Sequence, residues 1–223
     1  MKGKTYICGR RYIYDMNDRY MNESKEIRIR PAGPADAALV ARLLILAWPV
    51  DAFLAMDEGL TDENLCETVT SLAGKTGNLY GYDNVLVAEI PNPEGKSDVV
   101  GAICGYDGAL FPELRKAVAQ EMVRRFPKAA GGLEEWPCEA SEDEFYLDSV
   151  GVLPECRGMG IASALFRTMF ERAGNQGHKV AGLLVDEEKP EAERLYLRLG
   201  FTFDGFKDFF GHRMKHLVYS LSE

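Results

Sequence analysis

Histidine and paired cysteine are scarce in this sequence. The 223 residues include three His and five Cys, and no Cys-x-x-Cys motif occurs. An odd number of widely spaced cysteines is typical of reduced thiols rather than of a disulfide framework, and it offers no zinc-binding pattern. We therefore expect a cytoplasmic protein that binds no metal.

A long apolar run is also missing. The longest stretch rich in apolar residues, 37–50, is interrupted by Arg42 and is shorter than the roughly 20 residues that a membrane-spanning helix needs. The first 20 residues hold five Lys and Arg but no apolar segment, which is unlike a secretory signal. We expect no membrane partner.

Positive charge is in deficit. There are 26 Lys and Arg against 35 Asp and Glu, which gives a net charge of −9. Proteins that hold nucleic acid do so through basic patches, so no nucleic-acid partner is expected, although a local anion pocket is compatible with this balance. Apolar residues make up 46% and charged residues 27%, an ordinary globular mix, and a chain of this length can bury a core without disulfides or metal.

Residues 1–24 differ from the rest of the chain. They are polar, rich in Tyr and without clean periodicity, whereas an alternating pattern starts at Ile27. We expect this segment to be a disordered extension or to precede the true start at Met21; a strand over 6–14 is the alternative. Residues 25–223 are expected to form one domain with a helical insertion at about 107–141.

The remaining pattern alternates between strands and helices. Short apolar stretches bounded by Gly and Pro predict strands over 27–30, 85–90, 99–104, 145–152, 179–185, 201–209 and 214–221. Apolar residues at helical spacing predict helices over 34–48, 61–72, 112–126, 161–173 and 190–199. A loop rich in Gly and Pro is expected over 129–140. The fold class is therefore mixed α/β.

One segment points to a ligand. A strand ends near Leu153, and Arg157, Gly158, Met159 and Gly160 then open a helix. Glycine lets a backbone approach a ligand closely, and the first amides of a helix point outwards without partners. These amides, the positive helix end and the Arg157 guanidinium suit a phosphate. The turn therefore predicts a pyrophosphate site; a tight turn without a ligand is the alternative.

Two other phosphate-binding motifs fit less well. Residues 74–76 (Gly-Lys-Thr) resemble the end of a Walker A loop, but Val69 stands where that loop needs Gly. A dinucleotide-binding GxGxxG fingerprint that starts at Gly158 has Ser163 in place of its last Gly. Only 63 residues follow Gly160, too few for a full dinucleotide domain.

The glycine turn also resembles a family signature. Residues 157–162 (Arg-Gly-Met-Gly-Ile-Ala) match the Arg/Gln-x-x-Gly-x-Gly/Ala motif of the Gcn5-related N-acetyltransferases (GNAT). Residues 146–154 resemble the fourth strand of that family, and 192–201 are similar to its Ala-x-x-Leu-Tyr-x-x-x-Gly-Phe element. Residues 27–36 resemble its opening. The resemblance covers roughly residues 26–221.

The resemblance implies a twisted, mostly antiparallel sheet that splays between its fourth and fifth strands and is flanked by helices. Family enzymes pass an acetyl group from acetyl-CoA directly to an amine in one ternary complex. The pantetheine arm would pair with the backbone of the fourth strand, and the pyrophosphate would bind the glycine turn. The residues assigned in this way to acetyl-CoA are Val150, Val152, Leu153, Arg157, Gly158, Met159, Gly160, Ile161 and Ala162.

Three side chains are candidates for the chemistry. Tyr196 holds the family's usual position for the acid that protonates the departing thiolate; a plain core residue is the alternative. Counted back from the glycine turn, Glu144 falls where histone-acetylating relatives carry their base, and Asp148 is the second candidate. The alternatives are a solvated acid at a strand start for Glu144 and a hydrogen bond that fixes strand geometry for Asp148. A water chain would need no single base, and an amide of the fourth strand would bind the developing oxyanion.

Two positions depart from the family pattern. Lys189 stands where Asn is frequent, and Cys156 stands where an aromatic or polar residue is common. Residues 129–156 contain eight acids and no Lys or Arg, which would draw a cationic amine; a solvated acidic loop is the equal alternative. Residues 48–59 and the insertion are expected to shape the acceptor pocket.

The sequence thus predicts an N-acetyltransferase that uses acetyl-CoA and a small-molecule or peptide amine. Two alternatives come from other classes: a CoA-binding sensor without turnover, and, with less support, a dinucleotide-binding oxidoreductase. A homodimer is expected by analogy with the family alone.

Overall fold

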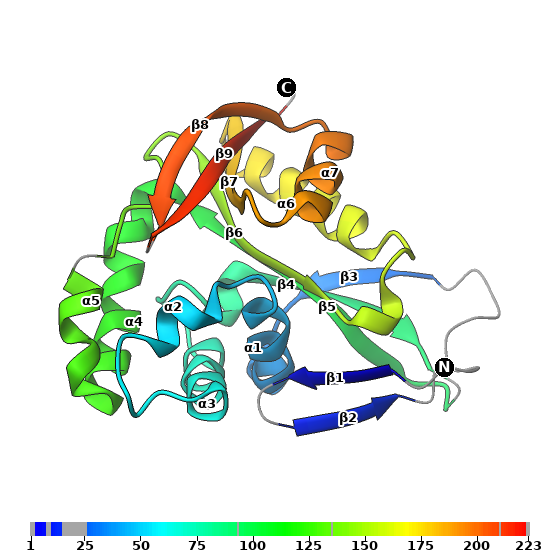
Figure 1. Cartoon of the computed structure of the whole chain (residues 1–223). Helices are drawn as coiled ribbons and strands as arrows, with labels where there is room; N and C mark the ends of the chain where they lie inside the picture. The colour runs from blue at the N-terminus through cyan, green and yellow to red at the C-terminus, as the bar shows by residue number, and fades with distance from the viewer. Residues whose placement is uncertain are drawn as a thin grey trace.

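The computed structural model describes residues 3–7, 10–14, 26–92, 94–134, 136–209 and 211–221. Its centre is a seven-stranded sheet in the order β3-β4-β5-β6-β7-β9-β8 (Figure 1). Neighbouring strands are antiparallel except β6 and β7, which run parallel. The strands are β3 (Arg28–Pro31), β4 (Val85–Pro91), β5 (Ser97–Asp107), β6 (Phe145–Val152), β7 (Val180–Asp186), β8 (Thr202–Phe209) and β9 (His212–Ser220).

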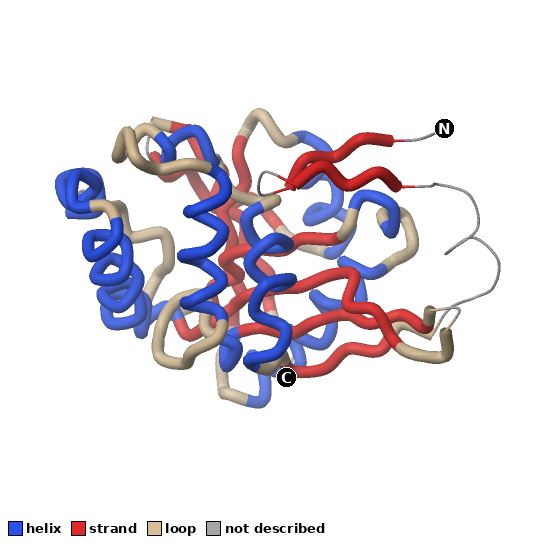
Figure 2. The backbone as a smooth tube through the Cα atoms, turned by 90° about the horizontal axis from the view of Figure 1, so that it is seen from below, coloured by secondary structure: helices blue, strands red, loops and turns tan. Residues whose placement is uncertain are grey.

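Helices cover both faces of this sheet, which confirms the mixed α/β class (Figures 1 and 2). The helix α1 packs against β5 and β6 on one face, and α3 packs against α1. On the opposite face, α6 packs against β4, β5 and β6. The helices are α1 (Ala37–Ile45), α2 (Val50–Leu54), α3 (Asp62–Ala73), α4 (Phe111–Arg125), α5 (Ala130–Glu134), α6 (Ile161–Asn175) and α7 (Pro190–Leu199).

The apolar residues of α6 determine where this helix lies on the sheet. Its buried residues are Ile161, Leu165, Phe166, Met169 and Ala173, at the spacing that places them on one face. They belong to one core cluster with apolar side chains of the sheet. Because this face fixes α6 on the sheet, its N-terminus is held close behind the carboxyl end of β6.

The parallel strands β6 and β7 are paired at one end only. Phe145 pairs with Ala181 and Tyr146 with Gly182, and the described residues of the two strands form no further rung. Beyond these rungs the strands diverge, so the edge of β6 from residue 147 onward faces an opening. This confirms the splay between the fourth and fifth strands of the domain.

A β-bulge interrupts β6 at Asp148. On β5, the adjacent residues Cys104 and Gly105 pair with Ser149 and Leu147, so Asp148 is left without a partner. A bulge shifts the alternation of side chains by one residue. Phe145 and Leu147 pack in the α6 cluster before the bulge, and Val150 and Val152 pack in it afterwards.

The structure contains two short helices that the sequence analysis does not predict. The helices α2 and α5 each have five residues, too few for a helical period to be read. The loop expected over 129–140 therefore contains α5, and the insertion holds α4 as well. The first helix ends at Ile45 rather than near Trp48, because Pro49 disfavours helical geometry in the residue before it.

The first strands form a separate hairpin. The strand β1 (Gly3–Ile7) pairs antiparallel with β2 (Arg10–Tyr14), in the segment for which the sequence analysis named a disordered extension or a strand over 6–14. Positions 15–25 lie outside the described residues, so a start at Met21 stays a prediction. Within the described part of the chain, no helix has the length and apolar character to cross a bilayer.

Candidate active site

The glycine turn opens α6 onto a cavity. Gly158 and Gly160 have φ angles of 79° and 81°, in the left-handed region that favours glycine. A Cβ built on either residue would meet no neighbouring atom within 4 Å, so the space in front of the turn is open. The cavity measures about 560 Å³ and is lined by the turn, the end of β6 and part of α7. This geometry suits an anionic group on the first amides of α6.

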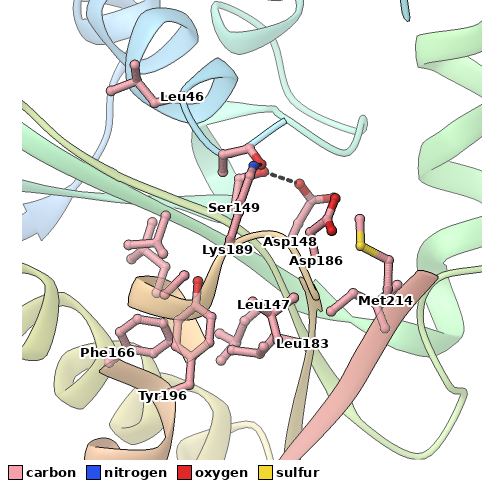
Figure 3. Close-up of a pocket in the computed structure, with 16 residues that line it drawn as sticks. Leu46, Leu147, Asp148, Ser149, Phe166, Leu183, Asp186, Lys189, Tyr196 and Met214 are labelled. Carbon is pink, nitrogen blue, oxygen red and sulfur yellow. Dashed lines mark hydrogen bonds between the residues drawn. The ribbon is translucent and has the colours of Figure 1, made fainter. Parts of the chain in front are cut away.

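A second cavity, of about 160 Å³, lies in the splay between β6 and β7 (Figure 3). It shares Leu46, Val150, Ala192 and Tyr196 with the first cavity, so the two cavities lie side by side. We call the two cavities together the splay groove. It reaches from the glycine turn to Asp148.

Most residues assigned to acetyl-CoA lie along this groove. Those that line it are Val150, Val152, Arg157, Gly158, Gly160, Ile161 and Ala162. Leu153 and Met159 do not line it and instead pack against the core, so a role for either would rest on backbone groups. The Arg157 Nε donates to the carbonyl of Val152 at 3.4 Å, and the side chain is exposed beside the turn.

Asp148 is half-buried at the bulge and is held from two sides. The Tyr106 hydroxyl donates to its Oδ2 at 2.8 Å, and the Ser149 hydroxyl donates to its Oδ1 at 2.6 Å. Trp48 Nε1 in turn donates to Ser149 Oγ at 2.9 Å. Burial raises the pKa of Asp148, and the two hydrogen bonds oppose this shift because they favour the carboxylate.

Tyr196 projects from α7 into the splay groove. Its ring packs edge-on against Phe166, with centroids 5.6 Å apart, and its hydroxyl points towards the cavity (Figure 3). Burial raises the pKa of Tyr196 to about 12, so the phenol keeps its proton at neutral pH. A proton donor and a carboxylate thus line one cavity.

The comparisons with known proteins agree with this geometry. The model of the acetyltransferase (GNAT) family matches residues 94–201. The crystal structure of an N-acetyltransferase from Staphylococcus aureus Mu50 superposes with a TM-score of 0.71 and 26% identity, over 86% of this chain and 100% of that one. Residues 94–201 of this chain thus match the GNAT acetyltransferase family, and the structure has the fold of GNAT N-acetyltransferases.

Two further structures support the GNAT fold. A crystal structure of an acetyltransferase has a TM-score of 0.68 and 27% identity, over 87% of this chain and all of that one. The histone acetyltransferase HPA2 and related acetyltransferase from Corynebacterium glutamicum ATCC 13032 has a TM-score of 0.59 and 21% identity, over 88% and 97% of the chains, which shows the fold alone. No curated protein sequence matches the chain.

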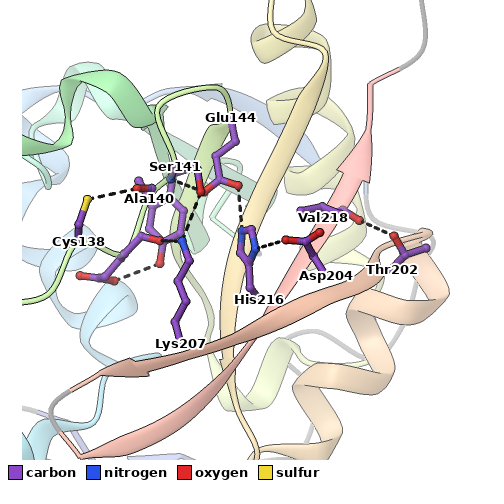
Figure 4. Close-up of polar contacts among 11 residues, drawn as sticks. Cys138, Ala140, Ser141, Glu144, Thr202, Asp204, Lys207, His216 and Val218 are labelled. Atoms are coloured by element: carbon purple, nitrogen blue, oxygen red, sulfur yellow. Dashed lines mark hydrogen bonds and ion pairs between the residues drawn. The ribbon is translucent and has the colours of Figure 1, made fainter.

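The structure places Glu144 away from the splay groove of this GNAT domain. The amide of Ser141 donates to its Oε1 at 2.8 Å, and its Oε2 lies 2.9 Å from Nε2 of His216 (Figure 4). His216 Nδ1 lies 3.0 Å from Asp204 Oδ2, so the imidazole bridges two carboxylates. The carboxylate is packed so closely on β7 that a Cβ on Gly182 would lie 1.9 Å from it. Glu144 therefore joins β6 to β9 and has no access to the groove.

A smaller cavity, of about 60 Å³, adjoins the splay groove. Asp148 and Ser149 line both spaces, so the two meet at Asp148. Aromatic rings form much of its wall, and we call it the side pocket. The rings are those of Trp48, Phe53, Tyr80, Tyr146 and Phe209.

Glu139 is a side-pocket residue that the sequence does not single out from the other acids of its segment. Trp136 Nε1 donates to its Oε1 at 3.0 Å, and the Tyr146 hydroxyl donates to its Oε2 at 3.1 Å. Burial and the charge of Asp148 raise the pKa of Glu139 to about 8. A cluster of acids in the sequence is a signal for such a residue, but only the fold shows which member lines the side pocket.

Lys189 crosses the groove at the start of α7. Its Nζ donates to the carbonyl of Ala47 at 2.7 Å, which links α7 to the segment after α1. Burial lowers the pKa of Lys189. The other departure from the family pattern, Cys156, is fully buried beside α6, which fits a packing role.

Proposed function

We propose that this GNAT protein transfers the acetyl group of acetyl-CoA directly to a primary amine within one ternary complex. The observation that carries the proposal is the arrangement of the splay groove. Its two adjoining cavities reach from the open amides of the glycine turn to Asp148, and Tyr196 lines both. A ligand with an anionic end and a reactive end can occupy such a space over its whole length.

The groove fits acetyl-CoA at both ends. The amides of Gly158 to Ala162 and the Arg157 guanidinium would hold the pyrophosphate. The pantetheine arm would pair with Val150, Val152 and Leu153, on the side of β6 that β7 leaves open. No part of this arrangement requires a metal.

The side chains at the closed end of the groove supply acid and base. The amine nitrogen forms a bond to the acetyl carbon while the bond from that carbon to sulfur breaks. Asp148 takes the proton of the amine, directly or through water, and Tyr196 gives a proton to the thiolate. An amide near Val150 would stabilise the charge that develops on the carbonyl oxygen. Because Glu144 is enclosed by Ser141 and His216, we assign it no part in the transfer.

A first experiment measures thermal stability with acetyl-CoA, with NADH and ATP as controls. A ligand that binds only the folded state raises the melting temperature. A rise with acetyl-CoA alone, followed by thiol release when amines are added, would support the proposal. A rise without thiol release would favour a CoA-binding sensor, and a rise with NADH instead would favour the oxidoreductase.

The cellular setting is part of the same proposal. We place the protein in the cytoplasm, because its cysteines are odd in number and widely spaced. A homodimer remains a prediction, which size-exclusion chromatography with light scattering would test.

A further inference from the structure

The side pocket combines aromatic faces with negative charge. Among the described residues, its lining contains two carboxylates, those of Asp148 and Glu139, and no Lys, Arg or His. The rings come from distant parts of the chain: Trp48 and Phe53 from the region of α2, and Phe209 from the end of β8. Aromatic faces and carboxylates both attract cations, so the lining selects one sign of charge.

Neutral groups surround the two carboxylates. Asp148 accepts from Tyr106 and Ser149, and Glu139 accepts from Trp136 and the phenol of Tyr146. These donors orient the carboxylates but carry no charge themselves. A carboxylate that is partly removed from water is costly without a cation, so the pocket gains from a cationic ligand.

Lys207 is a cation close to Glu139, and it bonds to the backbone rather than to the carboxyl. Lys207 on β8 donates from Nζ to the backbone carbonyl of Glu139 at 2.6 Å and to Ser141 Oγ at 3.4 Å (Figure 4). Lys207 does not line the side pocket. Its bonds hold the segment that carries Glu139 in place and leave the carboxyl facing the cavity.

We propose that the acceptor is a small unbranched diamine, with one nitrogen at Asp148 and the second, as an ammonium, at Glu139 among the aromatic rings. This inference rests on the proposed acetyl transfer. Asp148 lines both the splay groove and the side pocket, whereas Glu139 lines the side pocket alone. The two carboxylates therefore mark a reacting end and a recognition end. The small volume, about 60 Å³, favours an unbranched chain.

The transfer changes only the reacting end of the diamine. Its neutral nitrogen forms the bond to the acetyl carbon, the carbon–sulfur bond of the thioester breaks, and the nitrogen loses a proton to Asp148. The thiolate gains a proton from Tyr196. The second ammonium keeps its charge and its contacts throughout. An acceptor with a carboxylate at this end would meet Glu139 with a like charge and be rejected.

Acceptor affinity should depend on pH because Glu139 has a raised pKa. The ionisable groups around it are Asp148 and Tyr146 on β6, Tyr106 on β5, Tyr80 before β4 and Lys207 on β8. With a pKa of about 8 in the empty pocket, Glu139 is mostly protonated at pH 7 and must lose this proton to pair with an ammonium. The KM of the diamine should therefore fall as the pH rises towards about 8.

The test compares three acceptors of equal length in the thiol-release assay: diaminobutane, aminobutanol and aminobutyrate. Their far ends are cationic, neutral and anionic. We expect kcat/KM for diaminobutane to exceed that for aminobutanol by about tenfold to a hundredfold, the range for a hydrogen bond to a charged group. Aminobutyrate should be the poorest acceptor. Equal use of diaminobutane and aminobutanol would overturn the proposal.

The variant Glu139→Gln tests the recognition end. Gln has nearly the same shape and can still accept from Trp136. The variant should raise the KM of diaminobutane to that of aminobutanol and abolish the pH dependence of this KM. It should leave the acetyl-CoA melting shift unchanged. Glu142→Gln is the matched control, since Glu142 is an exposed acid of the same segment. An unchanged diaminobutane KM in Glu139→Gln would refute the assignment.

Failure of the acetyl transfer can be recognised separately. If none of the amines releases thiol, the proposed function is wrong whatever the pocket binds. Calorimetric titration of diaminobutane then tests the pocket directly. Binding that is lost in Glu139→Gln and kept in Glu142→Gln would still support the cation site, and absence of binding to the unaltered protein would overturn it.

Discussion

The hydroxyl of Tyr106 on β5 lies 2.8 Å from Oδ2 of Asp148, across the point where β6 bulges away from its partner strand. The bulge releases Asp148 from the strand ladder, and the phenol then fixes where its carboxylate points. Strand pairing and the orientation of the proposed base are thus connected through one hydrogen bond.

Tyr106→Phe should shift the pH profile of the enzyme. The hydrogen bond from Tyr106 favours the ionised form of Asp148. Its loss in the variant should therefore raise the pKa of Asp148 further. The base would then be protonated over a wider range, and the acid limb of kcat/KM should move to higher pH. A profile measured between pH 5 and 9 checks this, and an unmoved acid limb would argue against Asp148 as the base.

Tyr196→Phe should separate catalysis from binding. Loss of a general acid typically costs a factor of about 100 or more in rate, so kcat should fall at least that far. The ring contact with Phe166 is kept, and the acetyl-CoA melting shift should stay close to that of the unaltered protein. Equal losses in turnover and acetyl-CoA affinity would count against the acid role.

Gly158→Val should abolish acetyl-CoA binding while the fold persists. A branched side chain would occupy the open space before the turn, and a φ of 79° would cost about 1–2 kcal/mol of stability. Gly77→Val is the control: its φ is 70°, its surroundings are equally open, and it does not line the splay groove. Isothermal titration with acetyl-CoA should show binding in the Gly77 variant only.

Glu144→Gln should impair stability and spare the chemistry. Removing one partner of a buried ion pair costs about 3 kcal/mol or more, and both side chains are almost fully buried here. Glu144 raises the pKa of His216, so this stabilisation is complete at low pH and is lost as the pH rises through the folded pKa. The variant should therefore lose most stability, by denaturant unfolding, at pH 5 and less at pH 9. A large drop in kcat would restore Glu144 as a candidate base.

The features that could be predicted from the sequence depend on residues that are close together along the chain. The limits of β6 and the buried face of α6 follow from apolar residues at period two and period 3.6, which depend on neighbours in the chain. The glycine turn could be located because Gly158 and Gly160 are needed for its backbone angles. These features fix the ligand end of the splay groove.

The features that could not be predicted depend on contacts between residues that are far apart in the sequence. Glu144 is enclosed by His216, which is 72 residues away, and simple alternation along a strand cannot indicate such a partner. The bulge at Asp148 depends on register with β5, which the sequence of β6 does not contain. Glu139 becomes distinct from its acidic neighbours only because Trp136 and Tyr146 enclose it.

The two-rung pairing of β6 and β7 has a consequence for the cost of ligand entry. A strand-like ligand that enters a closed sheet must first break the hydrogen bonds of the strands it separates. Here Tyr146 and Gly182 form the last rung, and the described residues of β7 do not pair with β6 beyond it. The slot is therefore preorganised: a ligand that pairs with this edge separates no strands, and its affinity is not reduced by the work of opening the sheet.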